Sequence, residues 1–347
     1  MKKRKVGIIG CISESLDGQT IKTKTLYDEL SLTTDWKFYF ANTKYKSKHP
    51  LKLLLQTIRM LFSCKDIFIL VSQNGAKFYF PILFCATKLL KTRVYHDVIG
   101  GNPQEYVLNN IRNKNYLNSF KVNWVETLQM CGDLAKVGVN NAEELPNFKK
   151  LTPVTEDTLV KKFEYPLPLC TFSRVMKEKG VEEAIDAVEQ INREYGFDVY
   201  SLDIYGLIDE NYKEDFYSKL SRSSPIIKYC GIVPYSESVS TVKNYYALLF
   251  PTYWFGEGFP GTIVDAFASG VPVIASDWNS NKEIVENFVS GIVYPNDKIK
   301  SLIDCLKWAE QNSMEMIKFR YNCLIEFQKY IPEKYVRKIV ERVEMNE

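Results

Sequence analysis

The chain has 347 residues, enough for two domains, and its 46% hydrophobic and 25% charged residues are typical of a globular protein. Its two histidines, and eight cysteines without a C-x-x-C pair, argue against a Cys/His zinc site, and no apolar run approaches the roughly 20 residues that span a bilayer. The net charge of +3 is uneven, because residues 1–150 carry +11 and the remainder −8. The basic half indicates an anionic partner, and nucleic acid, an acidic lipid surface and a phosphorylated acceptor stay open beside two solvated surfaces of different charge.

The first half alternates short apolar runs with segments of helical spacing. The earliest run, residues 6–10, is too short for the apolar core of a signal peptide and is typical of a buried strand. Pro50 stands where a proline favours the start of a helix. The expected order is strand 6–10, helix 18–30, strand 36–42, helix 49–62, strand 66–72, helix 76–90, strand 92–99 and strand 122–127.

A second alternating series begins near residue 168. Its clearest helix has apolar residues at positions 181, 184, 185, 188 and 191, which is the spacing of one helix face. The expected order is strand 168–172, helix 180–196, strand 198–206, strand 226–233, strand 246–252, helix 262–270 and strand 272–276, completed by segments 281–295 and 298–311.

This order predicts an α/β protein with two Rossmann-like, doubly wound domains. The polar segment 145–157 holds two prolines and is the expected boundary. We therefore expect domains at 1–155 and 156–330, with a helix at 331–347 that packs back toward the first domain. Because ligands bind at the carboxyl ends of parallel strands, the site is expected in a cleft that the two domains face.

Two basic residues follow the strand at 168–172. Arg174 comes directly after it, and Lys179 precedes Gly180 at the start of the next helix. An Arg fork, a Lys charge and the free N–H groups of a helix start together suit a diphosphate. Two exposed cations near a turn are the alternative interpretation.

A glycine- and proline-rich turn, WFGEGFPG, follows the strand at 246–252. Glu257 lies in the turn, Thr262 begins a short helix, and Asp265 lies within that helix. Carboxylates suit the vicinal hydroxyls of a sugar or ribose, and the helix start suits a phosphate. A loop Glu and an Asp favoured by the helix dipole are the alternatives.

The two motifs together resemble a known family. The pattern R-x4-K-G at Arg174–Gly180, then ALLFPTYWFGEGFPGTIVDAFASGVPVIAS and KEIVENFVSGIVYP, is similar to the family-4 retaining glycosyltransferases, which have the GT-B fold. The similarity covers most of residues 170–295 with order and spacing kept. It implies a C-terminal domain that binds a nucleotide-sugar donor and an N-terminal domain on the acceptor side.

The resemblance also implies a role for each matching residue. Arg174 and Lys179 would bind the donor diphosphate, Glu257 the donor sugar, and Asp265 the ribose. The backbone N–H groups of Phe259, Gly261 and Thr262 would approach sugar and phosphate, and Gly231 to Val233 would lie near the nucleobase.

Two positions depart from the family pattern. Asp265 replaces a Glu and is one methylene shorter, so its ribose contact must be drawn closer or bridged by water. Pro260 stands where the family has glycine and has no N–H to donate.

The N-terminal half resembles the family more loosely. Gly18, Gln19 and Thr20 stand at a helix start that would meet donor phosphate or acceptor, and Asn74 and Gly75 stand at a second strand-to-helix turn. His96 ends a strand where many family members have a cleft histidine near the transferred sugar, and a structural histidine is the alternative. Gly100, Gly101 and Glu126 complete the candidate residues on the acceptor side.

Residues 44–62 combine lysines with leucines at helical spacing. A basic amphipathic helix can lie on an anionic membrane, and a core-facing helix with a solvated basic edge is the alternative. The charge of the whole half favours contact with a membrane surface.

We therefore expect a retaining glycosyltransferase that moves a sugar from a nucleotide-diphosphate donor, such as a UDP-sugar, to an acceptor hydroxyl. The resemblance to bacterial capsule and exopolysaccharide assembly enzymes implies a lipid-linked glycan acceptor at the cytoplasmic face of the cell membrane. No D-x-D motif is present, so we expect neither metal nor cofactor, and no nucleic-acid partner because no recognised binding module appears. A non-catalytic GT-B binding partner and a sugar-nucleotide epimerase are the alternatives.

Overall fold

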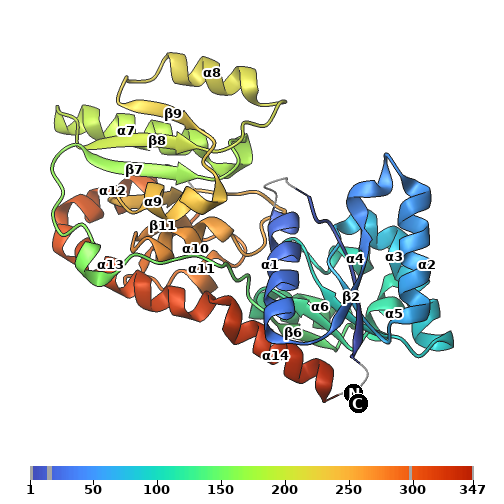
Figure 1. Cartoon of the computed structure of the whole chain (residues 1–347). Helices are drawn as coiled ribbons and strands as arrows, with labels where there is room; N and C mark the ends of the chain where they lie inside the picture. Colours follow the sequence, from blue (N-terminus) through green and yellow to red (C-terminus); the bar gives the residue numbers. More distant parts are fainter. Residues whose placement is uncertain (1–2, 14–17, 297–298, 346–347) are drawn as a thin grey trace. The chain divides into compact units, whose positions relative to one another are not determined.

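The computed structural model describes residues 3–13, 18–296 and 299–345. The chain divides into two compact units, which Figure 1 shows: residues 1–150 with 331–347 form the first unit, and residues 151–330 form the second. The boundary thus falls after Lys150 rather than after residue 155. Residues 151–155 belong to the second unit, where the Val154 N–H donates to the Ala268 carbonyl at 2.9 Å.

The first unit is built on six parallel strands in the order β2-β1-β3-β4-β5-β6. The strands are β1 (Lys5–Gly10), β2 (Lys37–Asn42), β3 (Asp66–Ile69), β4 (Arg93–Asp97), β5 (Val122–Val125) and β6 (Ala142–Glu144). The helices are α1 (Gly18–Thr33), α2 (Pro50–Ser63), α3 (Gln73–Leu89), α4 (Glu105–Leu108), α5 (Arg112–Asn118), α6 (Leu128–Lys136) and α14 (Pro332–Glu344), and the 3-10 turn η1 (Thr43–Lys46) precedes α2.

Alternate residues of these strands point to opposite faces of the sheet and belong to two separate hydrophobic cores. Ile67 and Ile69 of β3 pack under α2 to α6 on one face, whereas Phe68 packs on the other face under α1 and α14. The strands are apolar on both faces because helices cover both faces. The last helix of the chain, α14, lies beside α1 and buries Val336 and Ile339.

The second unit is built on six parallel strands in the order β12-β11-β10-β7-β8-β9. The strands are β7 (Leu167–Phe172), β8 (Tyr200–Tyr205), β9 (Ile227–Gly231), β10 (Ala247–Phe250), β11 (Val273–Ser276) and β12 (Gly291–Tyr294). The helices are α7 (Val181–Tyr195), α8 (Lys213–Ser221), α9 (Ser238–Val242), α10 (Gly261–Ala268), α11 (Asn281–Ile284), α12 (Ile299–Gln311) and α13 (Ser313–Phe327), with the 3-10 turns η2 (Glu156–Thr158), η3 (Lys177–Lys179), η4 (Tyr235–Glu237) and η5 (Gln328–Tyr330).

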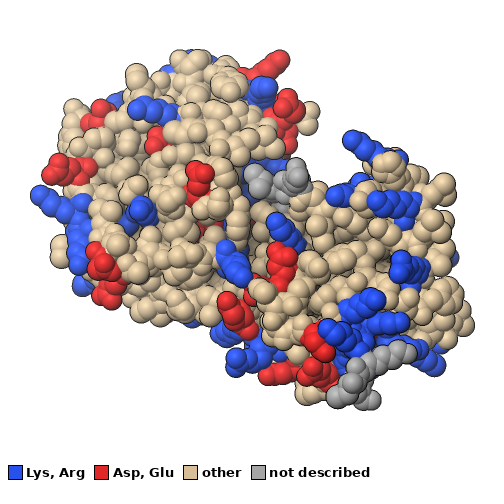
Figure 2. Space-filling model, in the orientation of Figure 1, with Lys and Arg blue, Asp and Glu red and all other residues tan. Residues whose placement is uncertain are grey.

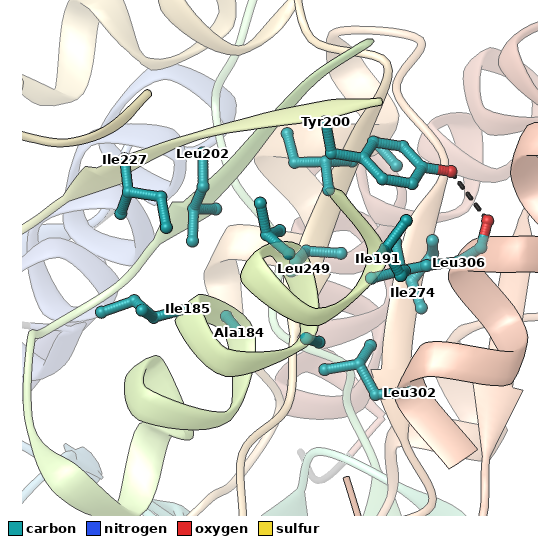
Figure 3. Packing of buried hydrophobic residues seen from close by; sticks show 14 of the residues in the cluster. Ala184, Ile185, Ile191, Tyr200, Leu202, Ile227, Leu249, Ile274, Leu302 and Leu306 are labelled. Atoms are coloured by element: carbon teal, nitrogen blue, oxygen red, sulfur yellow. Dashed lines mark hydrogen bonds between the residues drawn. The ribbon is translucent and has the colours of Figure 1, made fainter. Parts of the chain in front are cut away.

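The main core of the second unit lies between its sheet and helices α7, α8 and α12 (Figure 3). Ala184, Ile185 and Ile191 recur on one face of α7 and are fully buried, which is the amphipathic pattern expected of a covering helix. The buried Tyr200 hydroxyl donates to the Leu306 carbonyl at 2.7 Å, so this polar group is satisfied inside the core. Helix α10 packs with α9 and α13.

Two glycines with nearly the same backbone conformation flank α7. Gly180 precedes the helix with φ of 73°, and Gly196 follows it with φ of 76°. A Cβ on Gly180 would lie 2.1 Å from the Pro251 carbonyl oxygen, whereas a Cβ on Gly196 would meet nothing within 4 Å. Gly180 therefore permits both a left-handed conformation and a close approach to the end of β10.

We expect Gly180→Ala to destabilise the protein well beyond the roughly 1–2 kcal/mol of a left-handed alanine, because the backbone of residue 251 must also move. Gly196→Ala is the matched control, and we expect it to cost only the conformational term. Thermal unfolding of both variants measures the difference. Equal losses for the two variants would show that the close approach carries no cost.

Candidate functional site

The predicted site residues of the second unit lie where neighbouring strands end. Strands β7 and β10 pair in parallel, and segments 173–180 and 251–260 follow their carboxyl ends. Because parallel strands end at the same edge of a sheet, these two segments converge.

Lys179 and Glu257 form a buried ion pair at this edge. Lys179 Nζ lies 2.5 Å from Glu257 Oε2, and the two side chains are only 9% and 6% exposed. Removing charges from water is costly, and a close partner offsets that cost only when further polar contacts complete the geometry. The sequence predicted both residues as ligand contacts, and the structure joins them to each other.

Thr252 supplies one of these further contacts and was missed from the sequence. Its hydroxyl donates to Glu257 Oε2 at 3.0 Å and accepts from the Trp254 N–H at 3.3 Å. The indole of Trp254 also lies 4.9 Å from Lys179 Nζ, a cation–π distance. A threonine at the end of an apolar strand was the available signal, but its partner depends on how the following turn folds.

The turn that carries Glu257 is fixed by the loop after β11. The Trp278 indole N–H donates to the Trp254 carbonyl at 2.8 Å. The Asn279 amide donates to the Glu257 carbonyl at 2.9 Å, and the Ser276 hydroxyl donates to the Thr252 carbonyl at 2.6 Å. The carboxylate of Glu257 is therefore held by neighbours on both its backbone and its side chain.

Arg174 differs from Lys179 in its surroundings. Its side chain is exposed, and within residues 3–13, 18–296 and 299–345 no ion-pair or hydrogen-bond partner of its guanidinium is found. Beside it, a Cβ on Gly206 would lie 1.8 Å from the Ser173 carbonyl oxygen. The segment after β7 thus presents the exposed cations Arg174 and Lys177 and the buried cation Lys179.

The start of α10 holds the remaining candidates of the turn. Phe259 is buried against the Tyr330 ring, with centroids 5.1 Å apart. Gly261 is the first helical residue. The Thr262 hydroxyl oxygen is buried without a hydrogen-bond partner in the part of the chain that the structure describes. An unpaired buried hydroxyl at a helix start is a position that a ligand oxygen can satisfy.

Asp265 lies inside α10 and is 3% exposed. The Ser238 hydroxyl of α9 donates to its Oδ1 at 2.9 Å. Gly231 ends the edge strand β9 with φ of 82°, and Val233 follows it, half-buried. In the strand order, β9 is separated from β7 by β8, so Gly231 and Val233 follow a different strand end from Arg174.

A buried charge cluster joins α1 to the ends of β4 and β5 in the first unit. Lys22 Nζ lies 2.7 Å from Asp97 Oδ1 and 2.9 Å from Glu126 Oε1. All three side chains are buried. Glu126 was a candidate from the sequence, whereas Lys22 and Asp97 were missed because only the fold brings α1 against the two strand ends.

His96 lies in the core of the first unit, a position that favours the structural alternative over the catalytic role. Its side chain is 0% exposed, and the rings of Phe80, Tyr106 and Phe120 surround it with centroids 5.1 to 6.0 Å away. Nδ1 lies 2.9 Å from Asn123 Oδ1. Burial lowers the pKa of His96 to about 4. The ring is enclosed, and its Nε2 is buried without a hydrogen-bond partner among the described residues.

Three of the acceptor-side candidates line one cavity of about 380 Å³ in the first unit. Gln19, Asn74 and Gly75 contribute to it, together with Lys44 and Lys46 of η1. The remaining candidates lie elsewhere: Thr20 is buried in α1, Gly18 is the first residue of α1, and Gly100 and Gly101 lie in the loop after β4.

The described residues hold no group of three or more His, Cys, Asp or Glu side chains placed to bind a metal ion. Among the same residues, no helix has the length and apolar character needed to cross a bilayer.

Comparison with known proteins finds a family model that matches the second unit. Residues 160–323 match the family model described as Glycosyl transferases group 1. The amylovoran biosynthesis glycosyltransferase AmsK of Erwinia amylovora is 24% identical over 186 residues, which cover 51% of this chain and 45% of that protein. The match thus spans less than half the length of this curated relative.

Solved structures resemble the whole chain. HepE of Anabaena, in complex with UDP-glucose, has a TM-score of 0.77 at 14% identity and covers 98% of this chain and 99% of its own. Sucrose-phosphate synthase from Thermosynechococcus elongatus has a TM-score of 0.76 at 13% identity, with 99% of both chains covered. The apo form of the lipopolysaccharide outer core galactosyltransferase WaaB has a TM-score of 0.68 at 14% identity, with 99% of this chain and 100% of its own covered. These likenesses confirm the predicted GT-B fold class with its two Rossmann-like units.

A double-mutant cycle tests the buried pair. We expect Lys179→Met or Glu257→Gln alone to cost about 3–5 kcal/mol of stability, because each leaves an uncompensated buried charge, and the double variant to cost clearly less than their sum. The exposed pair Lys318–Glu315 on α13 is the control and should show little coupling. Additive losses at Lys179 and Glu257 would contradict a direct energetic link.

The acid stability of the first unit tests His96 and Asp97. Burial lowers the pKa of His96 from 6.5 to about 4, so stability is lost as the pH falls through this interval, where only the unfolded chain takes up the proton. Burial raises the pKa of Asp97 from 3.8 to about 6, so protonation of the folded state adds stability as the pH falls from about 6 toward 4. The two effects oppose each other.

Asp97→Asn removes the second effect. We expect the free energy of unfolding of this variant to fall more steeply than that of the wild type as the pH is lowered from 6.5 toward 4. Urea unfolding across this range measures both slopes. Lys22 stays charged throughout this range, so loss of its contact with Asp97 lowers the free energy of unfolding by the same amount at every pH. Parallel curves of unfolding free energy against pH for the two proteins would contradict the raised pKa of Asp97.

Proposed function

We propose, from the match of residues 160–323 to the family model described as Glycosyl transferases group 1, that this protein transfers a sugar from a UDP-sugar to an acceptor hydroxyl, with retention of the anomeric configuration. The observation that carries the proposal is the buried Lys179–Glu257 pair beside the exposed Arg174, at the ends of two adjacent strands. The donor identity is supported by the fold shared with HepE, whose structure is a complex with UDP-glucose.

The cations act on the leaving group. When the bond from the anomeric carbon to the diphosphate oxygen breaks, negative charge grows on the diphosphate. Arg174 can fork onto two of its oxygens, and Lys179 adds a fixed charge from a site with little water. Glu257 and Thr252 hold Lys179 in place before the donor arrives, so little reorganisation is needed during the reaction.

Glu257 and the start of α10 position the donor. Lys179 and Thr252 both contact Oε2 of Glu257. In this proposal the other carboxylate oxygen, Oε1, accepts hydrogen bonds from the donor-sugar hydroxyls. The backbone of Phe259 and Gly261 and the hydroxyl of Thr262 contact sugar and phosphate. Asp265 contacts the ribose.

The reaction balances without an added base. The acceptor oxygen bonds to the anomeric carbon on the face that the diphosphate leaves, and the acceptor proton passes to the departing phosphate oxygen. The products are the glycoside and UDP. Arg174 and Lys179 supply the positive charge that the departing diphosphate needs, so we propose that the reaction does not require a metal ion. A chelator should therefore leave the rate of transfer unchanged.

The acceptor is proposed to be a lipid-linked glycan in cell-surface polysaccharide synthesis. AmsK, the relative with a matching segment, is described by its role in amylovoran biosynthesis. The cavity of the first unit that Lys44 and Lys46 line has the charge that a phosphate-bearing acceptor requires.

Replacement of Arg174 tests the proposal. We expect Arg174→Lys to lower kcat/KM by about 10²–10³-fold, because a point charge cannot replace a two-pronged donor to the leaving group. Arg193→Lys, at an exposed position on α7, is the matched control and should keep wild-type activity. The measurements are UDP release with and without acceptor, and the anomeric configuration of the product.

The same assay separates the alternatives. UDP released only when an acceptor is present supports transfer. UDP released without an acceptor, together with an altered free sugar, indicates an epimerase. Wild-type protein that UDP does not stabilise against heat would contradict the proposed donor, since a ligand of the folded state raises the melting temperature.

A further inference from the structure

Helix α2 is apolar on two opposite sides. Toward the sheet it buries Leu53, Thr57 and Met60. Away from the sheet, Leu51, Leu55, Ile58 and Phe62 recur at i, i+4, i+7 and i+11, so they share one face. These four side chains are 74%, 68%, 43% and 78% exposed. The outer stripe is therefore largely open to solvent in the described part of the chain.

Helix α3 extends this surface. It covers the same side of the sheet as α2, and the hydroxyls of Thr57 and Tyr79 lie 3.2 Å apart and tie the two helices together. Phe78 and Leu89, at i and i+11, share the outer side of α3 and are 56% and 80% exposed. We call Leu51, Leu54, Leu55, Ile58, Phe62, Phe78 and Leu89 the α2–α3 face. Contiguous exposed apolar side chains of this kind mark an interaction surface.

The charge around the α2–α3 face has one sign. Residues 36–96 contain eleven Lys and Arg but a single acidic residue, Asp66. Asp66 is buried and accepts from Arg93 at 2.7 and 2.8 Å, so it does not offset the surface charge. Figure 2 shows Lys and Arg side chains over the part of the first unit that carries β2 and α2.

Two of the cations flank the stripe itself. Lys52 Nζ lies 4.1 Å from the Tyr45 ring centroid, and Arg59 lies 5.6 Å from that of Tyr39. On the helix, residues 52 and 59 fall about a quarter turn from the apolar stripe. An apolar stripe with a basic edge is the pattern of a helix that lies in the plane of an anionic membrane.

A second copy of the chain is a poorer occupant of this surface. Two copies joined through the α2–α3 face would bring two sets of cations together, and residues 36–96 offer no exposed carboxylate to pair with them. Protein interfaces are also depleted in lysine. An anionic lipid surface meets both requirements, because it takes up the apolar side chains and supplies negative charge.

We propose that the α2–α3 face docks on an anionic lipid membrane, with Leu51, Leu55, Ile58 and Phe62 in the interfacial region. Lys44 and Lys46 then contact lipid phosphates at the mouth of the cavity that they line beside Leu53 and Phe78. The docking itself does not require the proposed activity. The use of this cavity for the headgroup of a lipid-linked acceptor does rest on it.

Co-sedimentation with vesicles tests the docking. We expect the full chain to sediment with vesicles of phosphatidylcholine mixed with phosphatidylglycerol, more weakly with phosphatidylcholine alone, and less as salt is added. Leu55→Gln/Phe62→Gln should lower binding by about tenfold or more. Lys44→Gln/Lys46→Gln should lower binding to the mixed vesicles and reduce its salt dependence.

A matched control comes from the second unit. Met314→Gln/Ile325→Gln removes two apolar side chains of α13 that are 72% and 64% exposed, and it should leave vesicle binding unchanged. If Leu55→Gln/Phe62→Gln does not fold, Leu51→Gln/Ile58→Gln replaces it. The proposal is overturned if the wild type sediments with neither vesicle, or if both double variants and the control sediment alike.

Two further measurements keep the outcomes distinct. UDP should raise the melting temperature of the wild type and of the Leu55/Phe62 variant equally; a wild type without this rise contradicts the proposed function and leaves the docking result intact. Size-exclusion chromatography shows whether a second copy covers the face instead. A wild-type dimer that becomes a monomer in the Leu55/Phe62 variant, without any vesicle binding, would overturn membrane docking.

Discussion

The proposed chemistry depends on a buried lysine held against a buried glutamate. Lys179 can sit at the end of β7 only because Gly180, the next residue, lets the backbone pass within contact of Pro251. Through Pro251 and Thr252, the same contact fixes the start of the loop that carries Glu257. A local steric constraint, the absence of one Cβ, thus sets the position of a charge and of its partner together.

The sequence predicted most of the fold, whereas it did not predict the contacts within the site. The alternation of buried strands and amphipathic helices predicted both sheets, because apolar strands covered on both faces leave a strong pattern. The helices α4, α5 and α6 have only 4, 7 and 9 residues, too few for the helical pattern to repeat, and they were not predicted. The edge strand β6, with 3 residues, was missed for the same reason. Arg174, Lys179 and Glu257 were found through their motif. Thr252 is only five residues from Glu257, but its contact depends on how the turn between them folds. Asn279 comes from the loop after another strand, 22 residues away, so no spacing rule reveals its contact.

His96 and Asp97 show why adjacent residues are hard to assign. Successive side chains of a strand point to opposite faces, so one of the two must lie under the α2 to α6 layer and the other under α1. The sequence favoured the histidine because it ends a strand at the position where the resembling family has a cleft histidine. The structure gives the histidine an aromatic enclosure and gives the aspartate the charged partners Lys22 and Glu126. The polar neighbour Lys22 comes from α1, which covers the face that Asp97 points to. The sequence did not predict which face of the sheet α1 covers.

The first unit is interrupted in the sequence by the whole of the second. Helix α14 covers residues of α1 and of the central strands, yet it follows the second unit in the chain. During synthesis, the apolar side of the first sheet that α14 shields stays open until nearly all of the second unit has left the ribosome. The second unit can therefore fold while the first is still incomplete, and α14 then closes the core to which β1 contributes.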